Sequence, residues 1–128
     1  MIKMSNEKPP NWNKLVKLFG VEWGTVVVTW GDTYYCAVPL STDVVVHESV
    51  HMRQQINPKK WWKRYYKDVD FRIEQETEAY REQFKFVRRN TKDRNVIFKV
   101  QDQLARDLSG KMYGNCMDYI TAFNIIKG

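Results

Sequence analysis

This chain of 128 residues has very little histidine or cysteine, with two of each. The two cysteines, Cys36 and Cys116, form no CxxC pattern, which predicts reduced, buried thiols in a cytoplasmic protein rather than a disulfide framework. The first residues, MIKMSNEKPPNWNK, contain no apolar stretch long enough for a secretory signal, and no later apolar run approaches a membrane span. Internal repeats and low-complexity segments are also absent. These absences predict a cytoplasmic globular protein with no membrane partner.

The composition is that of a soluble globular domain, with 43% hydrophobic and 28% charged residues. A chain of this length can bury an ordinary core, so we expect a single domain over residues 1–128 that needs no metal merely to fold. Residues 1–10, which end in Pro9-Pro10, are expected to form a loose lead-in. The net charge of +6 permits an acidic partner such as nucleic acid, but a basic solvated surface is the preferred interpretation.

Turn and cap signals divide the first part of the chain into a helix and two strands. The segment NWNKLVKLFG predicts a short helix that Asn11 caps and Gly20 ends. The segments Thr25–Trp30 and Thr33–Val38 are rich in β-branched and aromatic residues, which favour strands. The Gly-Asp pair between these segments is a strong hairpin-turn signal, so the two strands are expected to pair.

The rest of the chain predicts helices. After the N-cap candidates in STD at 41–43, the segment VVVHESVHMRQQI is expected to be helical to about residue 56, although its three consecutive valines alone would favour a strand. Pro58 suits the start of a helix in NPKKWWKRYY. Further helices are expected over Asp70–Arg89, over Arg94–Leu108 and from near Asn115, where Asp118 three residues on resembles a capping box. The predicted fold is therefore α+β, mostly helical with a small β-hairpin.

Both histidines lie in the stretch HESVHMRQQ. His47 and His51 are four residues apart on a predicted helix, so their imidazoles lie on one face and can converge on one metal ion. Glu48 is turned about 100° from His47, close enough to reach a water on that ion without being a ligand. This is the HExxH arrangement, and neutral imidazoles suit zinc. The spacing therefore predicts one zinc ion, Zn2+, per chain.

The third ligand is expected to be a carboxylate, because a catalytic zinc site usually has three protein ligands and no third histidine exists. The segment FRIEQETEAYREQ carries several glutamates on one predicted helix. Glu76 lies between Ile73 and Tyr80 on the face that must point inward, where an unpaired carboxylate would be costly. We therefore expect Glu76 to be the third ligand, with Glu78 as the second choice.

The stretches HESVHMRQQ and ETEAY resemble the gluzincin metallopeptidases, whose signature is HExxH followed by a helix that supplies a glutamate, often within ExxA. The segment from Glu76 to Ala79 matches that second pattern with Glu76 as the ligand. The combination of HExxHxxQ, which includes Gln54, with ExEAY is also similar to small bacterial and phage proteins assigned as metallopeptidases. The resemblance covers about residues 25–85 and implies a minimal zincin-like domain with a small sheet, an active-site helix and a glutamate-bearing helix.

The resemblance implies a zinc-dependent metallopeptidase that hydrolyses peptide bonds in a peptide or protein substrate. By this interpretation zinc lowers the pKa of its water, and Glu48 is the catalytic general base that later passes the proton to the leaving amine. Related enzymes often add a tyrosine or histidine that donates to the oxyanion, and here only tyrosines remain. The candidates are Tyr80, Tyr113 and Tyr119. Tyr80 is one turn after Glu76, and we favour a core role for it, beside the metal ligands.

In gluzincins the strand before the active-site helix binds extended substrate by backbone pairing. By position, the resemblance implies that Thr33–Val38 or its hairpin partner is this substrate edge, with Thr33, Tyr34, Tyr35 and Cys36 as its leading residues. A chain this short has few elements with which to line deep specificity pockets. We therefore expect peptidase activity that is weak or limited to few substrates. Such activity is compatible with dependence on a protein partner or an assembly.

Two alternatives stand beside the peptidase. The first is a catalytically silent zinc-binding protein of the same fold, with a structural or assembly role. If the chain comes from a phage, that role would be in the virion. Such a protein does not need Glu48, because Glu48 is not a ligand. The second is a basic nucleic-acid-associated protein, whose DNA binding would depend on salt and survive zinc removal. The stretch KKWWKRYYK can bind single strands, but we favour packing of its aromatic residues, which are Trp61, Trp62, Tyr65 and Tyr66.

Overall fold

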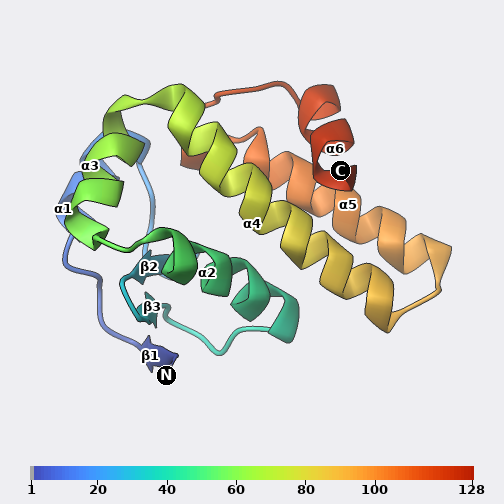
Figure 1. Cartoon of the computed structure of the whole chain (residues 1–128), viewed down its shortest axis with the longest axis horizontal. Helices are drawn as coiled ribbons and strands as arrows, with labels where there is room; N and C mark the ends of the chain where they lie inside the picture. The colour runs from blue at the N-terminus through green and yellow to red at the C-terminus, as the bar shows by residue number, and fades with distance from the viewer. Residues whose placement is uncertain (1) are drawn as a thin grey trace.

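The computed structural model describes residues 2–128 and has a small sheet beside a set of helices (Figure 1). In chain order the elements are β1 (Lys3–Ser5), α1 (Trp12–Phe19), β2 (Val28–Trp30), β3 (Thr33–Tyr35), α2 (Thr42–Gln54), α3 (Pro58–Lys67), α4 (Val69–Asn90), α5 (Arg94–Leu108), the short 3₁₀ helix η1 (Lys111–Tyr113) and α6 (Tyr119–Lys127). The predicted α+β fold, mostly helical with a small sheet, is confirmed. No helix within these residues is long and apolar enough to cross a membrane.

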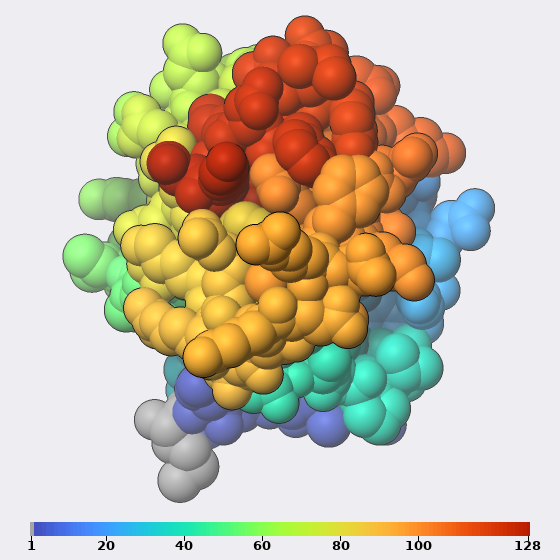
Figure 2. Space-filling view, turned by 90° about the vertical axis from the view of Figure 1, so that its right-hand side faces the viewer, coloured from blue at the N-terminus to red at the C-terminus, as the bar shows by residue number. Residues whose placement is uncertain are grey.

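The elements form layers, with α2 and α4 side by side at the centre (Figure 1). One side of α2 packs against β2, and the other side packs against α4. Beyond α4 lie α5 and α6, which pack on each other and on α4; Figure 2 shows them in orange and red over this end of the molecule. The HExxH stretch on α2 and the glutamate stretch on α4 therefore meet where these two helices pack against each other.

A short, capped turn fixes α3 against α4. The Asn57 side chain accepts a hydrogen bond from the Lys60 N–H, and Pro58 occupies the first turn, as its fixed φ angle predicts. Asp68 then ends α3 and caps α4 by accepting from the Phe71 N–H. Since Asp68 is the only residue between the two helices, the inward face of α3 lies against the start of α4.

The buried guanidinium of Arg72 holds three chain segments together. It donates to the carbonyl oxygens of Tyr65 and Tyr66 at the end of α3, and to that of Tyr113 in η1, at 3.0–3.1 Å. These carbonyls lack helical partners, so the guanidinium satisfies groups that burial would otherwise penalise. The same contacts bring η1, which lies more than forty residues further along the chain, next to α3.

The aromatic run KKWWKRYYK packs largely as predicted. Trp61, Trp62 and Tyr65 are buried in the core, whereas Tyr66 is half-buried and the lysines are exposed. The core continues through Tyr80 and Phe84 of α4 to the apolar faces of α5 and α6. The inward face of α3 thus consists of aromatic side chains, and its outward face carries the positive charges of the lysines.

The sheet differs from the predicted hairpin in one important respect. The expected loose lead-in contains β1, which pairs in parallel with β3, so the strand order is β1-β3-β2. The Lys3 N–H donates to the Asp32 carbonyl, and the Cys36 N–H donates to the Ser5 carbonyl. The prediction missed β1 because it is short and mostly exposed, so its main-chain pairing leaves no apolar pattern to find. The hairpin itself is present, but its strands are shorter than expected.

The helix boundaries also needed corrections near the C-terminus. The last helix begins at Tyr119 rather than near Asn115, because the Asp118 side chain accepts from the Thr121 N–H and acts as the N-cap. Asn115 adopts a left-handed conformation with φ 53°, which no helix can include. The helix that carries HExxH, α2, begins slightly earlier than expected and ends at Gln54.

Candidate metal centre

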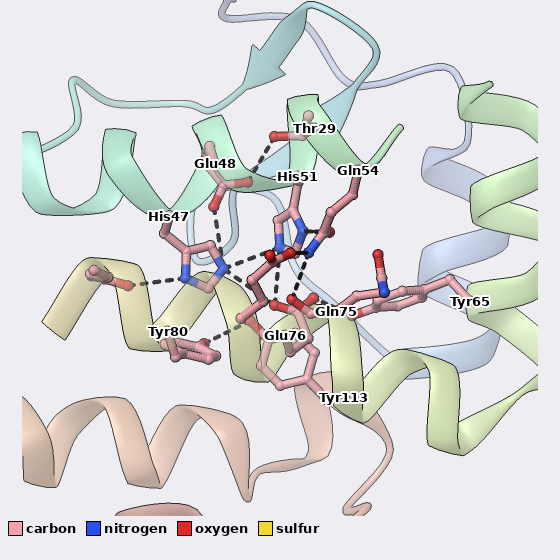
Figure 3. Close-up of polar contacts among 12 residues, drawn as sticks. Thr29, His47, Glu48, His51, Gln54, Tyr65, Gln75, Glu76, Tyr80 and Tyr113 are labelled. Atoms are coloured by element: carbon pink, nitrogen blue, oxygen red, sulfur yellow. Dashed lines mark hydrogen bonds and ion pairs between the residues drawn. The ribbon is translucent and has the colours of Figure 1, made fainter. Parts of the chain in front are cut away.

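The two histidines of α2 and Glu76 of α4 meet at one point inside the protein (Figure 3). The Nε2 atoms of His47 and His51 are 3.2 Å apart, and Glu76 Oε1 lies 3.2 Å from the first and 3.0 Å from the second. Zinc held tetrahedrally at 2.0–2.1 Å would separate its ligand atoms by about 3.3 Å. All three residues are buried, with 4–5% of their surface exposed. The predicted ligands therefore come together at a spacing that can hold a metal ion.

A glutamine amide fixes the ring of His47 with its Nε2 free for the metal. His47 Nδ1 lies 3.0 Å from Gln83 Oε1, and the Gln83 amide nitrogen donates to Asp43 at 2.8 Å. Because that donation assigns the amide orientation, the oxygen must face the histidine and accept from its Nδ1–H. The proton therefore sits on Nδ1, and the Nε2 lone pair points into the site.

His51 has the same arrangement with a different glutamine. Its Nδ1 lies 2.8 Å from Gln54 Oε1, while the Gln54 amide nitrogen donates to the Gln75 carbonyl and to Glu78. Gln54 is the glutamine of HExxHxxQ, and Glu78 is the second glutamate of ExEAY. Glu78, the second choice for the third ligand, is exposed and anchors Gln54 instead. One residue of each motif, Gln54 and Glu78, therefore helps to orient the His51 ring.

The electrostatics of the centre favour a positive charge between the three ligand atoms. Two Nε2 lone pairs face each other at 3.2 Å beside a carboxylate, an arrangement that repels itself unless a proton or metal ion lies between the three atoms. Burial lowers the pKa of His51, but the charges of Glu76 and Glu48 outweigh burial and raise this pKa to about 9. Burial also raises the pKa of Glu76, yet His51 and His47 hold it well below its usual value. The site therefore presents a carboxylate and a field that favours positive charge.

Tyr65 holds the second oxygen of Glu76, and sequence reasoning missed it as a site residue. Its hydroxyl donates to Glu76 Oε2 at 2.6 Å. Burial and the charge of Glu76 raise the pKa of Tyr65 well above its usual value, so the hydroxyl keeps its proton and remains a donor. Tyr65 belongs to α3, across a turn from Glu76, so no periodic pattern in the sequence links the two.

Glu48 lies beside the three ligand atoms without joining them. One of its oxygens, Oε1, accepts from the Thr29 hydroxyl at 2.9 Å, and Oε2 lies 3.8 Å from His47 Nε2. Burial raises the pKa of Glu48 although His47 and His51 lower it, and the resulting shift is upward. A buried carboxylate with a raised pKa and one unoccupied edge facing a cation site is suited to accept a proton from water.

The predicted tyrosines divide into two groups. The Tyr80 ring packs edge-on against His47 with centroids 4.3 Å apart, and the Tyr80 and Tyr113 hydroxyls are 2.7 Å apart (Figure 3). Both residues are buried next to the ligands, so the core position favoured for Tyr80 is confirmed. Tyr119 instead bonds to Asp102 and belongs to the contact between α5 and α6. That third candidate was wrong, because its side chain is engaged away from the centre.

Two hollows border the centre and share part of their lining. One covers about 490 Å³, including space open to solvent, and is lined by Thr29, Tyr65 and apolar residues of α1 and the following loop. The other covers about 560 Å³, also including space open to solvent, and reaches Asp107 of α5. His47, Glu48 and Tyr113 line both, as do three apolar residues that lie between them, Val26, Val27 and Met112. Both hollows therefore border the candidate metal centre, and the same three apolar side chains line each of them.

The predicted substrate edge at Thr33, Tyr34, Tyr35 and Cys36 is wrong. These residues belong to β3 and the residue after it, and β3 is the central strand with β1 and β2 on its two sides. Its main-chain groups are already paired, so an added peptide strand would find none free. Cys36 is buried beside this strand as a free thiol.

The hairpin partner β2 is an edge strand, but part of its edge is occupied. The Gln55 amide accepts from the Gly31 N–H at 2.8 Å and donates to the Thr29 carbonyl at 2.9 Å, which imitates a neighbouring strand. The indole N–H of Trp62 donates to the same carbonyl. Just before β2, Val26 and Val27 line both hollows.

Comparison with known proteins adds no assignment to this geometry. No family model matches the chain, and neither a curated protein nor a solved structure matches it. What the described residues establish is a buried group of two histidines and one glutamate that can hold a metal ion.

Proposed function

We propose that this protein is a zinc metallopeptidase of the gluzincin type, with His47, His51 and Glu76 as ligands of one zinc ion and Glu48 as the general base. The observation that carries the proposal is the meeting of three ligand atoms within 3.2 Å while Glu48 stays outside them. A purely structural site needs only the ligands, whereas a hydrolytic site also needs a base beside the ion.

The chain's own residues divide the chemical work. When bound, zinc supplies Lewis acidity, which lowers the pKa of a water molecule and polarises a scissile carbonyl. Glu48 accepts the proton of the attacking water at Oε2 and delivers it to the leaving amine, while the Thr29 hydroxyl keeps Oε1 fixed. Tyr113, which lines both hollows, is the candidate donor to the oxyanion, and Tyr80 orients its hydroxyl.

A specific observation also supports a silent, structural zinc protein as the second candidate. The ligands and Glu48 are at most 5% exposed, and Val26, Val27 and Met112 narrow the approach from both hollows. A substrate must displace or thread past these side chains. The two candidates share the metal and differ in whether a peptide reaches Glu48.

Elemental analysis of the purified protein tests the metal site first. We expect one zinc per chain in the wild type, and loss of most of it in His51→Ala and in Glu76→Gln, because each removes one of three ligands. Glu74→Gln is the matched control, since Glu74 is on the same helix but exposed and should leave zinc content unchanged. Wild-type protein without zinc after reconstitution would rule out both candidates.

Cleavage of a peptide library then separates peptidase from scaffold. The zinc-loaded wild type is expected to cut a limited set of sequences, as mass spectrometry of the products would show. Removal of zinc by a chelator should abolish cutting, and added zinc should restore it. A zinc-loaded protein that cleaves no member of the library would favour the structural candidate.

A further inference from the structure

The outer face of α3 borders a groove that the proposed peptidase does not use. This groove lies between α3, α1 and the end of β2, and covers about 920 Å³, including space open to solvent. Four of its lining side chains are lysines: Lys14, Lys59, Lys63 and Lys67. Trp62 lines both this groove and the hollow beside the metal centre, so one indole separates the two.

The lysines of the groove carry uncompensated charge. No acidic residue lines it, and among residues 2–128 none of the four ammonium groups lies within 4 Å of a carboxylate. The excess is local, because residues 1–67 contain ten Lys and Arg against five Asp and Glu, whereas residues 68–128 contain eleven against ten. Most of the net charge of +6 therefore belongs to the half of the chain that forms this groove.

The spacing of three of these lysines suits a linear polyanion. Lys59, Lys63 and Lys67 are four residues apart along α3, so they form one row with a rise of about 6 Å between neighbours. A row of ammonium groups along one wall tracks a chain of charges better than a single compact anion. Lys14 approaches from α1 on the opposite wall.

The groove also offers aromatic surface next to the row of lysines. Tyr66 and Trp30 are half-buried, and the Tyr66 ring is stacked on Trp62 with centroids 5.7 Å apart. The Tyr66 and Trp30 rings pack partly against the core, and the Lys14 ammonium lies over the Tyr66 ring at 5.4 Å from its centroid, so the exposed part of this aromatic surface lies next to cations. Flat rings interleaved with cations are the combination that binds unstacked nucleobases and their phosphates.

We infer that this groove binds single-stranded nucleic acid, with phosphates along Lys59, Lys63 and Lys67 and bases against Tyr66 and Trp30. A duplex is a poorer fit, because its bases are stacked on one another and cannot lie on these rings. An acidic peptide would satisfy the lysines but not the aromatic wall. This binding site is separate from the metal centre and does not rest on the proposed peptidase function.

Fluorescence anisotropy with a labelled oligothymidylate of about twelve nucleotides tests the inference. The wild type should bind at low salt, with an affinity that falls as salt rises. The triple variant K59Q/K63Q/K67Q should bind at least tenfold more weakly, and its salt slope should drop by about 2, from three lost phosphate contacts at roughly 0.7 each. The control K85Q/K92Q/K99Q removes the same charge from exposed lysines of α4, α5 and the loop between them.

The nature of the ligand is tested separately. An abasic oligonucleotide of equal length should bind at least fivefold more weakly than oligothymidylate, because it keeps the phosphates but loses the stacking. Tyr66→Leu should weaken oligothymidylate binding by a similar factor, whereas Tyr66→Phe keeps the ring and should not. Equal binding of the abasic strand or of polyglutamate, equal losses in the two triple variants, or no binding at low salt would each overturn the inference.

Discussion

The two faces of α3 show how one helix can serve a closed site and an open one. On the inner face, Tyr65 donates to Glu76 and Trp61 donates to Gln75, so each buried polar group has a partner. On the outer face, Lys59, Lys63 and Lys67 are exposed and form no ion pair within the described part of the chain. Buried polar groups are costly without partners, whereas exposed charges are solvated and remain available to a ligand. The comparison separates residues that complete the fold from residues available for binding.

Glu48→Gln is the most severe test of the closed site. Glutamine keeps the size of the side chain and can still accept from Thr29, but it cannot take a proton from water. Peptide cleavage by the zinc-loaded protein should fall by about 10²–10⁴-fold, while zinc content stays at the wild-type value. Initial rates and elemental analysis on the same samples, with Glu74→Gln as the control, check both parts. Undiminished cleavage would remove Glu48 from its role as the base.

Two adjacent tyrosines sharpen the comparison between the faces. Tyr65→Phe removes the hydroxyl that holds Glu76 Oε2, so zinc affinity should fall by about 10–100-fold. Tyr66→Phe removes a hydroxyl from the outer face, where it accepts from Asn11, and zinc affinity should not change. Competition with a zinc indicator measures both variants. A similar loss in the two would mean that the inner hydrogen bond has no special role.

The glutamine of HExxHxxQ should have a smaller effect on the same measurement. Gln54→Ala leaves His51 in place but frees its ring to rotate and to carry its proton on either nitrogen, so we expect about a tenfold loss of zinc affinity. The neighbouring exposed residue provides the control, since Arg53→Ala touches no part of the site. Unchanged affinity in Gln54→Ala would show that packing alone orients His51.

The smallest expected effect concerns Asp107, which lines the hollow beside His47 and Glu48 and has no cationic partner within 4 Å among residues 2–128. Under the proposed function, a substrate side chain with a positive charge would fit this hollow better than a neutral one of equal length. Asp107→Asn should lower the preference for lysine over norleucine by a few-fold, consistent with a partly exposed charge pair. Paired peptides differing only at that residue provide the readout, and Asp70→Asn is the control. An unchanged ratio would exclude contact with Asp107.

The sequence predicted site residues correctly where their relative positions depend on a single helix. His47, Glu48 and His51 could be placed on one helix because a spacing of four residues fixes their relative direction in any α-helix. Glu76 could be chosen over Glu78 because only Glu76 shared the apolar face of its own helix, and Glu76 is the buried member of the pair. The mostly helical α+β fold followed from similar local patterns.

Predictions failed or were missing where distant segments meet. The strand β1 becomes a strand only by pairing with β3, and that pairing turns Thr33–Tyr35 from an expected edge into the centre of the sheet. Likewise, Gln55 occupies the free edge of β2 through two hydrogen bonds that cross more than twenty residues of chain. Main-chain pairing of this kind depends on which segments approach, and a local pattern does not contain that information.

By itself, the sequence determined which residues can bind a metal ion and which residue stands beside it, because helical periodicity converts spacing into direction. Tertiary structure alone decided the rest of the centre. The turn at Asp68 brings Tyr65 to Glu76, and the packing of α2 on α4 brings Glu76 to the two histidines. That packing holds the two Nε2 atoms and the carboxylate about 3 Å apart, where a proton or a metal ion between them offsets their repulsion.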